Sequence, residues 1–410
     1  MSEWQKVKLG ELYEVHNGLS KGRQFFGTGF PFLTFSNVFN NWFLPEQLES
    51  LVQTTDKERE ACSIKAGDVF ITRTSETMDE LGMSSVALKD YPNATYNGFT
   101  KRLRPKTDRV FPRYMGYYLR TPKFRGQFMA FSSMTTRASL ANNDLLNMKV
   151  ELPSMEIQHR IATILSRYDS LIENYQKQIK LLEEAAQRLY KEWFIDLHFP
   201  GHENTNIVDG VPEGWEKKKL CELFSFVRGK SYTSKELSDE GTIMVNLKNI
   251  QSFGGYKSDV EKHFIGTFKE EQTLMKGDLI MGVTDMTQER RLVGSVALIP
   301  DFKETATFSM DLIKLISFKL PNIYLYCAMR YGDVSRQIAP LANGVNVLHL
   351  KPEAISNIEM VVASDSIIEK FVSYTSKTIE NILSLQSQLR LLTEARDRLL
   401  PKLMSGEIEI

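Results

Sequence analysis

The stretch GWEKKKLCELFSFVRG (Gly214–Gly229) decides the fold, because the chain has already used it once as EWQKVKLGELYEVHNG (Glu3–Gly18). Identical residues stand 211 positions apart in the two copies, at Trp4/Trp215, Leu9/Leu220, Glu11/Glu222, Leu12/Leu223 and Gly18/Gly229. Self-similarity at a fixed spacing indicates that one structural unit occurs twice.

Three further matches follow in the same order along the chain. GDVFITRTSETMDELGMSSVAL (67–88) matches GDLIMGVTDMTQERRLVGSVAL (277–298), and LLEEAAQRL (181–189) matches LLTEARDRL (391–399), both at a spacing of 210. FPFLTFSNV (30–38) corresponds to TIMVNLKNI (242–250). Each half therefore has a front part of short β-like runs bounded by Gly-Asp turns, followed by a long helix.

Both helices carry apolar residues in steps of four and three, which is the pattern of a coiled-coil seam. The predicted seam of the first helix is Ile157, Ile161, Ile164, Tyr168, Leu171, Tyr175, Gln178, Leu182, Ala185 and Leu189. That of the second is Ile368, Phe371, Thr375, Thr378, Ile382, Leu385, Leu389, Leu392, Arg396 and Leu399. An intervening domain can return the chain, so we expect an antiparallel internal pair. The alternatives are packing against their own domains or pairing between chains.

The predicted fold class is α+β, with two pseudo-twofold-related α/β domains separated by an antiparallel coiled coil of two long helices. The first helix, counted over the 38 residues from Ile157 to Phe194, would be a spacer of roughly 57 Å at 1.5 Å per residue. The expected segments are a first domain (1–153), a first helix (154–196), a linker (197–211), a second domain (212–363) and a second helix (364–404).

Composition excludes several classes of protein. The 410 residues are 42% hydrophobic and 25% charged, as in soluble proteins of two or more domains. Apolar runs fall short of a membrane helix, and the amino terminus does not read as a secretory signal. Cys62, Cys221 and Cys327 are scattered, which favours a reducing cytoplasm. Of the six histidines only His198 and His202 lie close together in the sequence, so no metal site is expected.

The net charge is zero, yet the basic residues are unevenly distributed. The stretch from Lys101 to Arg137 holds ten Lys or Arg against one acid, Asp108, with Tyr and Phe interleaved. Such a mixture suits a phosphate backbone, but it is equally typical of a solvated face over an aromatic core. The second domain, from Pro212 to Met360, is balanced at 19 basic and 19 acidic residues.

Motifs for catalysis are incomplete. Phe25-Phe-Gly-Thr-Gly29 imitates the loop that cradles S-adenosylmethionine, but it precedes a predicted strand, which favours a turn. Arg228-Gly-Lys-Ser231 lacks the first glycine of a phosphate loop. Pro300-Asp301 could start a metal-dependent nuclease motif, but Asp311-Leu-Ile-Lys314 is one residue longer than the acid-x-Lys partner that it needs. The residues thus indicate a protein that binds and positions, without a catalytic, metal or cofactor site of its own.

Taken together, these motifs resemble the DNA-specificity subunits of type I restriction–modification systems. The resemblance rests on the repeated WxxxxLxEL start, on the Gly-Asp runs and on LPSMEIQHRIA (152–162) before the first helix. Thr284-Asp-Met-Thr287 and NGVNVLHLKP (343–352) also look like segments of target-recognition domains. In the second half, VVASDSII (361–368) lacks the Pro and Gln of the family's helix start.

The resemblance implies a cytoplasmic, non-catalytic subunit that recognises a bipartite, asymmetric site on double-stranded DNA, one half per domain. Two adenine methyltransferase subunits would dock on it and supply their own S-adenosylmethionine, and two ATP-dependent restriction subunits can join. No membrane partner is implied. The alternatives are a protein-binding scaffold with two β-rich domains on a coiled coil, and an enzyme whose site is too dispersed to read.

Base reading favours Arg, Lys, Asn and Gln, and phosphate contacts favour basic and hydroxyl side chains. We predict DNA contacts from polar residues on loops beside the repeated strands. In the first half these are Lys21, Arg23, Ser36, Arg73, Thr74, Ser75, Arg102, Arg104 and Arg137. In the second half they are Arg228, Lys230, Lys248, Thr284, Gln288, Arg290, Arg291 and Asn346. For each, the alternative is a solvated surface residue.

Overall fold

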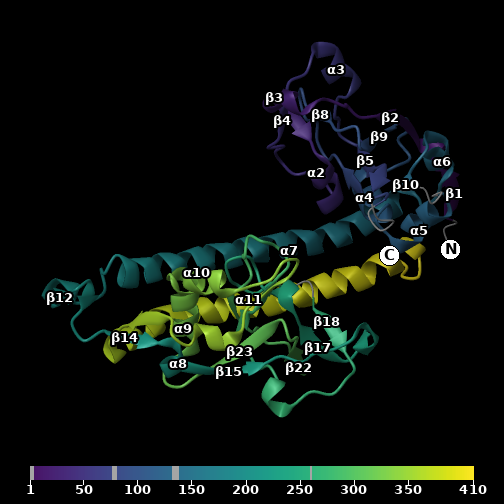
Figure 1. Cartoon of the computed structure of the whole chain (residues 1–410). Helices are drawn as coiled ribbons and strands as arrows, with labels where there is room; N and C mark the ends of the chain where they lie inside the picture. Colours follow the sequence, from purple (N-terminus) through teal and green to yellow (C-terminus); the bar gives the residue numbers. More distant parts are fainter. Residues whose placement is uncertain (1–3, 76–80, 132–137, 259–260) are drawn as a thin grey trace. The chain divides into compact units, whose positions relative to one another are not determined.

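A computed structural model of the chain describes residues 4–75, 81–131, 138–258 and 261–410 (Figure 1). The chain forms two compact units. The first comprises Met1–Asp169 with Ala395–Ile410, and the second comprises Ser170–Glu394. Two long helices, α7 (Met155–Tyr190) and α11 (Asp365–Ser405), contribute one part to each unit.

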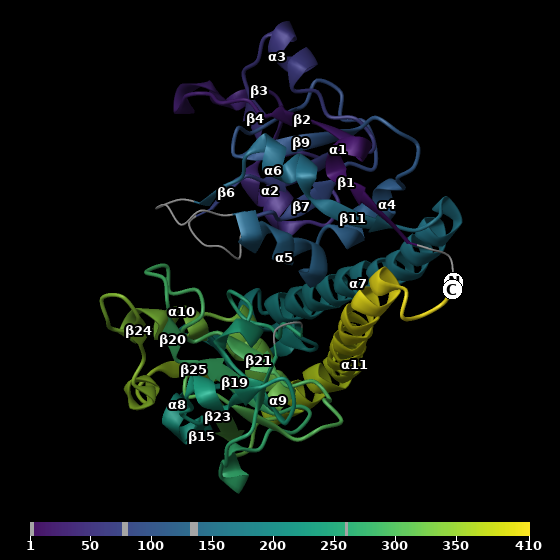
Figure 2. The same ribbon diagram turned by 90° about the vertical axis from the view of Figure 1, so that its right-hand side faces the viewer.

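The first unit is built on a four-stranded antiparallel sheet in the order β2-β9-β5-β7. Its strands are β2 (Tyr13–Asn17), β9 (Thr100–Pro105), β5 (Val69–Thr72) and β7 (Ser84–Val86). A second sheet has the order β4 (Leu51–Val52), β3 (Phe26–Leu33), β8 (Thr95–Tyr96), in which β3 and β8 are parallel. Two ribbons complete it, β1 (Gln5–Lys8) with β11 (Lys149–Leu152) and β6 (Thr74–Ser75) with β10 (Ala138–Ser139). Figure 2 shows β1 beside β11.

Short helices cover these sheets and fill the space between them. They are α1 (Leu9–Leu12), α2 (Phe35–Asn40), α3 (Asp56–Ala61), α4 (Pro112–Tyr118), α5 (Pro122–Phe131) and α6 (Asn142–Asn147). The core beneath α4 is aromatic, with Tyr114, Tyr117 and Phe124 almost fully buried. Burial of such large rings is the main stabilising term for a sheet of short strands.

The second unit repeats this plan, with one more strand in its second sheet. Its main antiparallel sheet is β15 (Phe224–Arg228), β23 (Leu312–Ser317), β19 (Leu279–Gly282), β21 (Val296–Leu298). Its second sheet is β16 (Leu237–Ser238), β18 (Lys262–Phe264), β17 (Thr242–Val245), β22 (Ala306–Phe308), and β17 is parallel to β22 as β3 is to β8. The ribbons are β14 (Glu216–Lys219) with β25 (Glu359–Val362) and β20 (Thr284–Asp285) with β24 (Leu348–His349). The helices are α8 (Leu220–Leu223), α9 (Asn322–Tyr331) and α10 (Val334–Ile338). The predicted α+β class and the internal repeat are confirmed.

The repeated opening motif has the same physical task in both units. Leu9, Leu12, Leu220 and Leu223 are buried, as expected for apolar anchors of the short helices α1 and α8. A glycine is required at the end of the motif because the backbone of a neighbouring strand end approaches it closely. A Cβ at Gly18, or at its counterpart Gly229, would lie 2.0 Å from a carbonyl oxygen of the neighbouring strand end.

The long helices α7 and α11 are antiparallel. In the second unit, the ring centroids of Tyr190 and Phe371 are 6.0 Å apart, while Leu182 and Leu385 line a common hollow further along. In the first unit, Asp169 of α7 bonds Arg396 of α11 at 3.0 Å. Early residues of α7 therefore meet late residues of α11, and Figure 1 shows the two helices side by side. This confirms the internal antiparallel pair.

The predicted seam of α7 is wrong at every other position over its second half, where Tyr175, Leu182 and Leu189 pack against the core as predicted but the positions between them do not. The buried residues of α7 include Ile172, Ile179 and Ala186, each one position after the predicted Leu171, Gln178 and Ala185, which are exposed. Adjacent apolar residues at 171 and 172 fit a heptad pattern equally well, so only packing selects between them. The predicted seam of α11 is better, because none of its ten positions is exposed.

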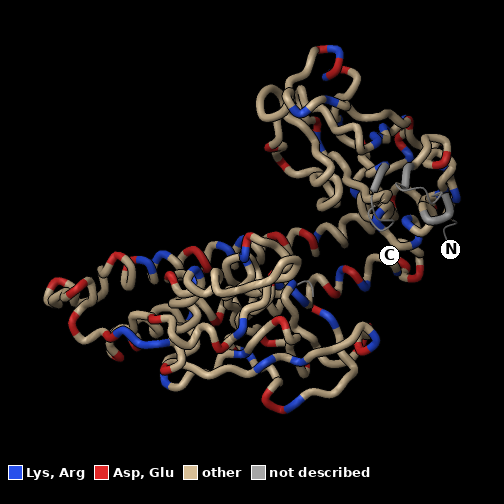
Figure 3. The backbone as a smooth tube through the Cα atoms, viewed as in Figure 1, with Lys and Arg blue, Asp and Glu red and all other residues tan. Residues whose placement is uncertain are grey.

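The outer face of α7 is charged. Acidic and basic residues alternate along it (Figure 3), and pairs four positions apart include Glu156–Arg160 at 2.7 Å and Glu173–Lys177 at 2.7 Å. Such pairs favour an exposed helix face. Among the described residues, no helix combines the length and apolar character needed to cross a membrane.

The predicted linker between the halves has structure of its own. A π-helix, Lys191–Ile195, follows α7, and β12 (Ile207–Val208) pairs with β13 (Val211–Pro212). Phe199 is buried against Trp215, with ring centroids 5.0 Å apart. An aromatic anchor thus fixes a segment whose glycine and proline content alone suggests a flexible connection.

Candidate nucleic-acid interface

One edge of the second unit gathers the ends of strands from both sheets. β15 ends at Arg228 and β19 ends at Gly282, next to the start of β23, because neighbouring strands of this sheet are antiparallel. The second sheet joins the same edge, since the Lys230 N–H donates to the Phe308 carbonyl at the end of β22 (2.7 Å). The loops that leave this edge are 229–233, 246–249, 283–295 and 309–311, together with 343–347. We call it the loop edge.

The first unit has a loop edge built in the same way. β2 ends at Asn17 and β5 ends at Thr72, beside the start of β9. The Leu19 N–H donates to the Tyr96 carbonyl at the end of β8 (2.8 Å), which is the counterpart of the Lys230 contact. The Arg73 N–H donates to the Phe99 carbonyl (2.9 Å), and the Val283 N–H donates to the Asp311 carbonyl (2.9 Å) in the second unit. Each unit therefore presents one set of equivalent loops.

Most predicted residues of the second unit lie on its loop edge. Lys248, Gln288, Arg291 and Asn346 are exposed, and Lys230 and Arg290 are partly buried. Arg228, at the end of β15, is exposed and pairs with Glu353 at 2.6 Å. That hydrogen-bonded partner holds the pKa of the Glu353 carboxyl below its usual value. Thr284 is buried, with its hydroxyl 3.4 Å from Nδ1 of His349, so its side chain supports the β20–β24 ribbon.

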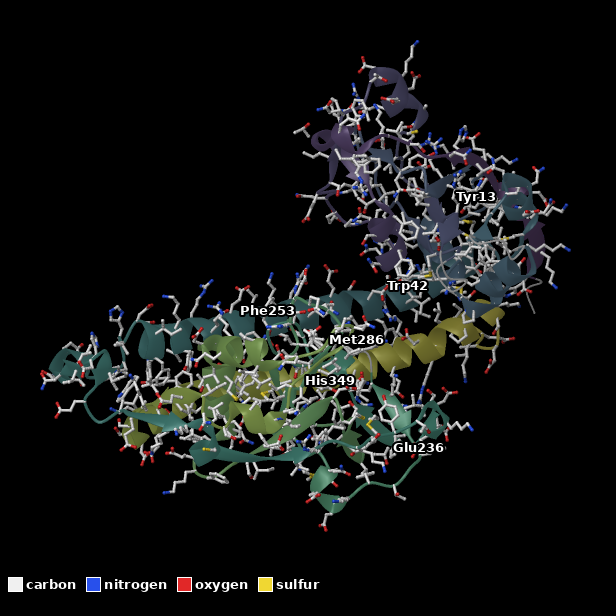
Figure 4. All side chains as sticks on the ribbon, viewed as in Figure 1. Tyr13, Trp42, Glu236, Phe253, Met286 and His349 are labelled. Carbon is white, nitrogen blue, oxygen red and sulfur yellow. The ribbon has the colours of Figure 1, made fainter. Side chains whose placement is uncertain are left out.

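Two loops of this edge are joined to each other. The Gln288 side-chain amide donates to the Val345 carbonyl (2.7 Å), and the Arg290 guanidinium donates to the Pro340 carbonyl (3.3 Å). Met286 and His349, labelled in Figure 4, belong to these two loops. Arg290 and Arg291 also line a cavity of about 630 Å³ with Arg330 and Arg336. Polar side chains from separate loops are thereby held close together.

The predicted residues of the first unit divide between the loop edge and the interior. Arg23 and Ser36 are exposed, and Lys21 is held by Glu58 at 2.8 Å beneath the ring of Phe25. The hydrogen bond from Lys21 keeps the pKa of Glu58 below its usual value. Arg73 is partly buried where β5 ends, directly before Thr74 and Ser75 of β6. Arg137 lies outside the described residues.

Arg102 and Arg104 are engaged inside the first unit. The Arg102 guanidinium is buried and donates to the Ser63 carbonyl (2.6 Å), and the Arg104 guanidinium pairs with the buried Asp68 at 2.6 Å. The hydrogen bonds that Arg104 donates to Asp68 raise the pKa of Arg104. Arg102 and Arg104 lie on strand β9 and not on an open loop. Their contacts are those of structural residues.

The same holds for much of the basic stretch 101–137. The guanidinium of Arg120 donates to the carbonyls of Ser84, Val38, Phe39 and Asn41 at 2.6–2.9 Å. Burial lowers the pKa of Arg120 to about 10. In the described part of this stretch, the tyrosine and phenylalanine rings lie in the core, and the basic side chains are either solvated or bonded internally. This agrees with the interpretation as a solvated face over an aromatic core. The sequence could not distinguish the two interpretations, because backbone carbonyl oxygens and phosphate oxygens both accept hydrogen bonds from the guanidinium group of arginine.

The glycine-rich segment Phe25–Gly29 is not the expected turn before a strand, because Phe26–Gly29 lie within β3 and form a bulge. Strand β3 shifts register between Phe26 and Phe30, which both pair with Val52 of β4. Gly27 and Gly29 have φ of 98° and 108°, which glycine adopts without strain. Within the described residues, no group of three or more His, Cys, Asp or Glu is placed to hold a metal ion.

The alignment of the two halves favours turn residues at Asn37 and Asn249. They accept the N–H of Thr34 (3.0 Å) and Asn246 (2.9 Å) at the start of equivalent helical turns. Asp285 was passed over, although its buried carboxylate accepts three hydrogen bonds from loop 286–292. The signal was present in the Thr-Asp-Met-Thr string, where an Asp before a Thr often forms an Asx turn.

Comparisons with known proteins agree with this architecture. The model of a family described as "Type I restriction modification DNA specificity domain" matches residues 1–184. The specificity subunit of the type I restriction enzyme MjaIX from Methanocaldococcus jannaschii is 26% identical over 419 residues, covering 100% of this chain and 94% of the relative. That of HindI from Haemophilus influenzae is 22% identical over 486 residues, covering 100% of both.

A crystal structure of the type I restriction–modification S subunit from M. genitalium has the same fold. It superposes with a TM-score of 0.58 at 15% identity, covering 98% of this chain and 96% of that chain. Repeated α+β domains and paired helices thus define the class as a two-domain protein with duplicated loop edges. The match of residues 1–184 and the full-length relatives show that the chain is similar to the DNA-specificity subunits of type I restriction–modification systems.

Proposed function

We propose that the loop edge of each unit reads one half of a bipartite, asymmetric site on double-stranded DNA. The observation that carries the proposal is the duplication of the edge, with the same strand ends and the same backbone contacts in both units. The loops differ in sequence, so two edges of one design can read different bases. Arg291, Gln288 and Asn346 are of the side-chain types that recognise guanine or adenine in the major groove.

The partners follow from this role. Two adenine methyltransferase subunits dock on the chain, bind S-adenosylmethionine themselves and modify one adenine in each half of the site. Two restriction subunits can add ATP-dependent translocation and cleavage. The chain performs no chemistry of its own, in line with the incomplete motifs and with the naming of its relatives as specificity subunits.

The test is methylation by the assembled complex. The chain is co-expressed with its cognate methyltransferase, and modified adenines are mapped across the host genome. We expect one split motif with two fixed halves. Replacing residues 1–153 by the first domain of another specificity subunit should change one half and leave the other intact. A properly folded chain that assembles with no methyltransferase would instead support a protein-binding scaffold.

Affinity gives a second measurement. The second domain has equal numbers of acidic and basic residues, and much of the basic stretch in the first unit is bonded internally. Few cations then remain to neutralise phosphates, so the subunit alone should bind DNA weakly and lose that binding as salt rises. Tight, salt-resistant binding by the isolated chain would contradict this expectation.

A further inference from the structure

The loop edge of the second unit carries two apolar side chains that the proposed polar contacts do not use. Val345 is 86% exposed and Met286 is 74% exposed, and they are the two most exposed large apolar residues in the described part of the chain. Single exposed apolar residues are common on protein surfaces. Here, however, both stand on loops that are bonded to each other.

The loop of Met286 is held rigidly from inside. The carboxylate of Asp285, only 1% exposed, accepts the backbone N–H of Thr287 (2.8 Å), the Thr287 hydroxyl (2.9 Å) and the backbone N–H of Leu292 (2.8 Å). A buried carboxylate with three donors is well stabilised, and it fixes both ends of the loop. Met286 therefore projects into solvent from a rigid support.

The loop of Val345 is closed at its base and attached to its neighbour. Asn343 and His349 exchange backbone hydrogen bonds of 3.0 and 2.9 Å, and Gly344 adopts a φ of 153° where a Cβ would lie 1.9 Å from the Val347 carbonyl oxygen. The Gln288 side chain and the pairing of Asp285 with Leu348 join the two loops. Both apolar residues are thus presented by one constrained structure.

We propose that Met286 and Val345 form an apolar contact to the bases of the second half-site, and that Asp285 is the positioning residue for this contact. The inference rests on the proposed function. Apolar side chains recognise the methyl group of thymine, which polar side chains read poorly. The surrounding side chains, Gln288, Arg291 and Asn346, are of the types that bind guanine or adenine, which favours DNA as the occupant.

The experiment uses the full chain in complex with its methyltransferase. In M286A/V345A we expect preference at one position of the second half-site to fall about tenfold, as for loss of one base contact. The first half-site should be unchanged. M286Q keeps the length of the side chain but not its apolar character, so it should also lose preference, whereas M286L should retain it. F318A is the matched control, because Phe318 is 55% exposed at the opposite end of β23.

Asp285 is tested separately. D285A should relax the same position, and D285N, which retains an acceptor oxygen, should restore part of the preference. Thermal unfolding of each variant shows whether the fold is kept, and a purely structural Asp285 would change stability without changing the motif. An unchanged motif in well-folded M286A/V345A overturns the inference, as does loss of methyltransferase assembly before DNA is added. If the wild-type complex methylates no split motif, the proposed function itself fails.

Discussion

The guanidinium of Arg330 on α9 forms a two-point ion pair with the carboxylate of Glu183 on α7, with Nη1–Oε1 and Nη2–Oε2 distances of 2.8 and 3.0 Å. Both side chains are largely buried, at 10% and 14% exposure. Burial opposes the charge of Arg330, but Tyr326 and the hydrogen bonds that Arg330 donates to Glu183 raise the pKa of Arg330 above the ordinary value. Within the second unit, this pair connects the β-rich domain to the long helix.

Removing one partner should therefore destabilise the second unit strongly. We expect E183A to lower the free energy of unfolding by about 3–5 kcal/mol, because it leaves a buried cation without its anion. Urea denaturation followed by circular dichroism measures the loss. E184A is the control, since Glu184 is more exposed and lies 3.9 Å from Arg188. Equal effects of the two variants would show that the buried pair contributes no more than a surface pair.

The phase of the helix seam can be tested with adjacent residues. Ile172 is 9% exposed in the core of the second unit, whereas Leu171 is 43% exposed. We expect I172A to cost about 2–4 kcal/mol through lost burial and a cavity. L171A should cost less than about 1 kcal/mol. The reverse order in thermal or urea unfolding would restore the seam predicted from the sequence.

Arg120 should be a stabilising residue of the first unit. Its guanidinium satisfies four carbonyl groups, so R120A should cost about 2–4 kcal/mol by leaving buried acceptors unpaired. R120K keeps the positive charge but not the planar guanidinium group, so its stability should lie between that of the wild type and that of R120A. The pKa of about 10 is below that of an unfolded arginine, so this group changes stability only in alkaline solution, and stability should not depend on it between pH 6 and 9. R113A, on the exposed face of α4, is the control.

The three cysteines should differ in reactivity. Cys221 is exposed, whereas Cys62 and Cys327 are buried and unpaired. Burial raises the pKa of the Cys62 thiol and raises that of Cys327 to about 12, so little thiolate is present at pH 8. A chromogenic disulfide reagent should therefore modify one thiol quickly in the native protein. C221S should abolish the fast phase. Three equal rates would mean that the buried thiols are accessible.

Glu289 should weaken DNA binding by the second unit. It pairs with the exposed Arg291 at 2.6 Å and places a negative charge on the loop edge. E289Q should therefore raise the affinity of the complex for DNA several-fold at low salt, and the gain should shrink as salt screens the charges. R291A should lower affinity. E216Q, which breaks the exposed Lys218–Glu216 pair on β14, should have no effect in the same fluorescence anisotropy titration.

Much of the architecture could be predicted from the repeated sequence. Trp4 and Trp215, with the leucines that follow them, marked two copies of one domain, and four-and-three spacing marked two long helices. The apolar pattern and the turn residues are sufficient to predict these elements, because both act locally along the chain. The candidate contacts on loops, such as Lys248 and Gln288, were found by residue type and by their place in the repeat. Their role in DNA recognition stays a prediction.

The sequence by itself determined that one unit occurs twice, that Gly18 and Gly229 close the opening motif, and that each half ends in a long helix. Only the tertiary structure decided which side of α7 is buried, that Arg102 and Arg120 bond internal carbonyls, and that Asp285 shapes a loop that exposes Met286. The physical reason is that pattern is read along the chain, whereas the partner of a charged or apolar group is selected across space. The residue type determines which groups a side chain can bond, and the fold determines which of these groups lies within reach.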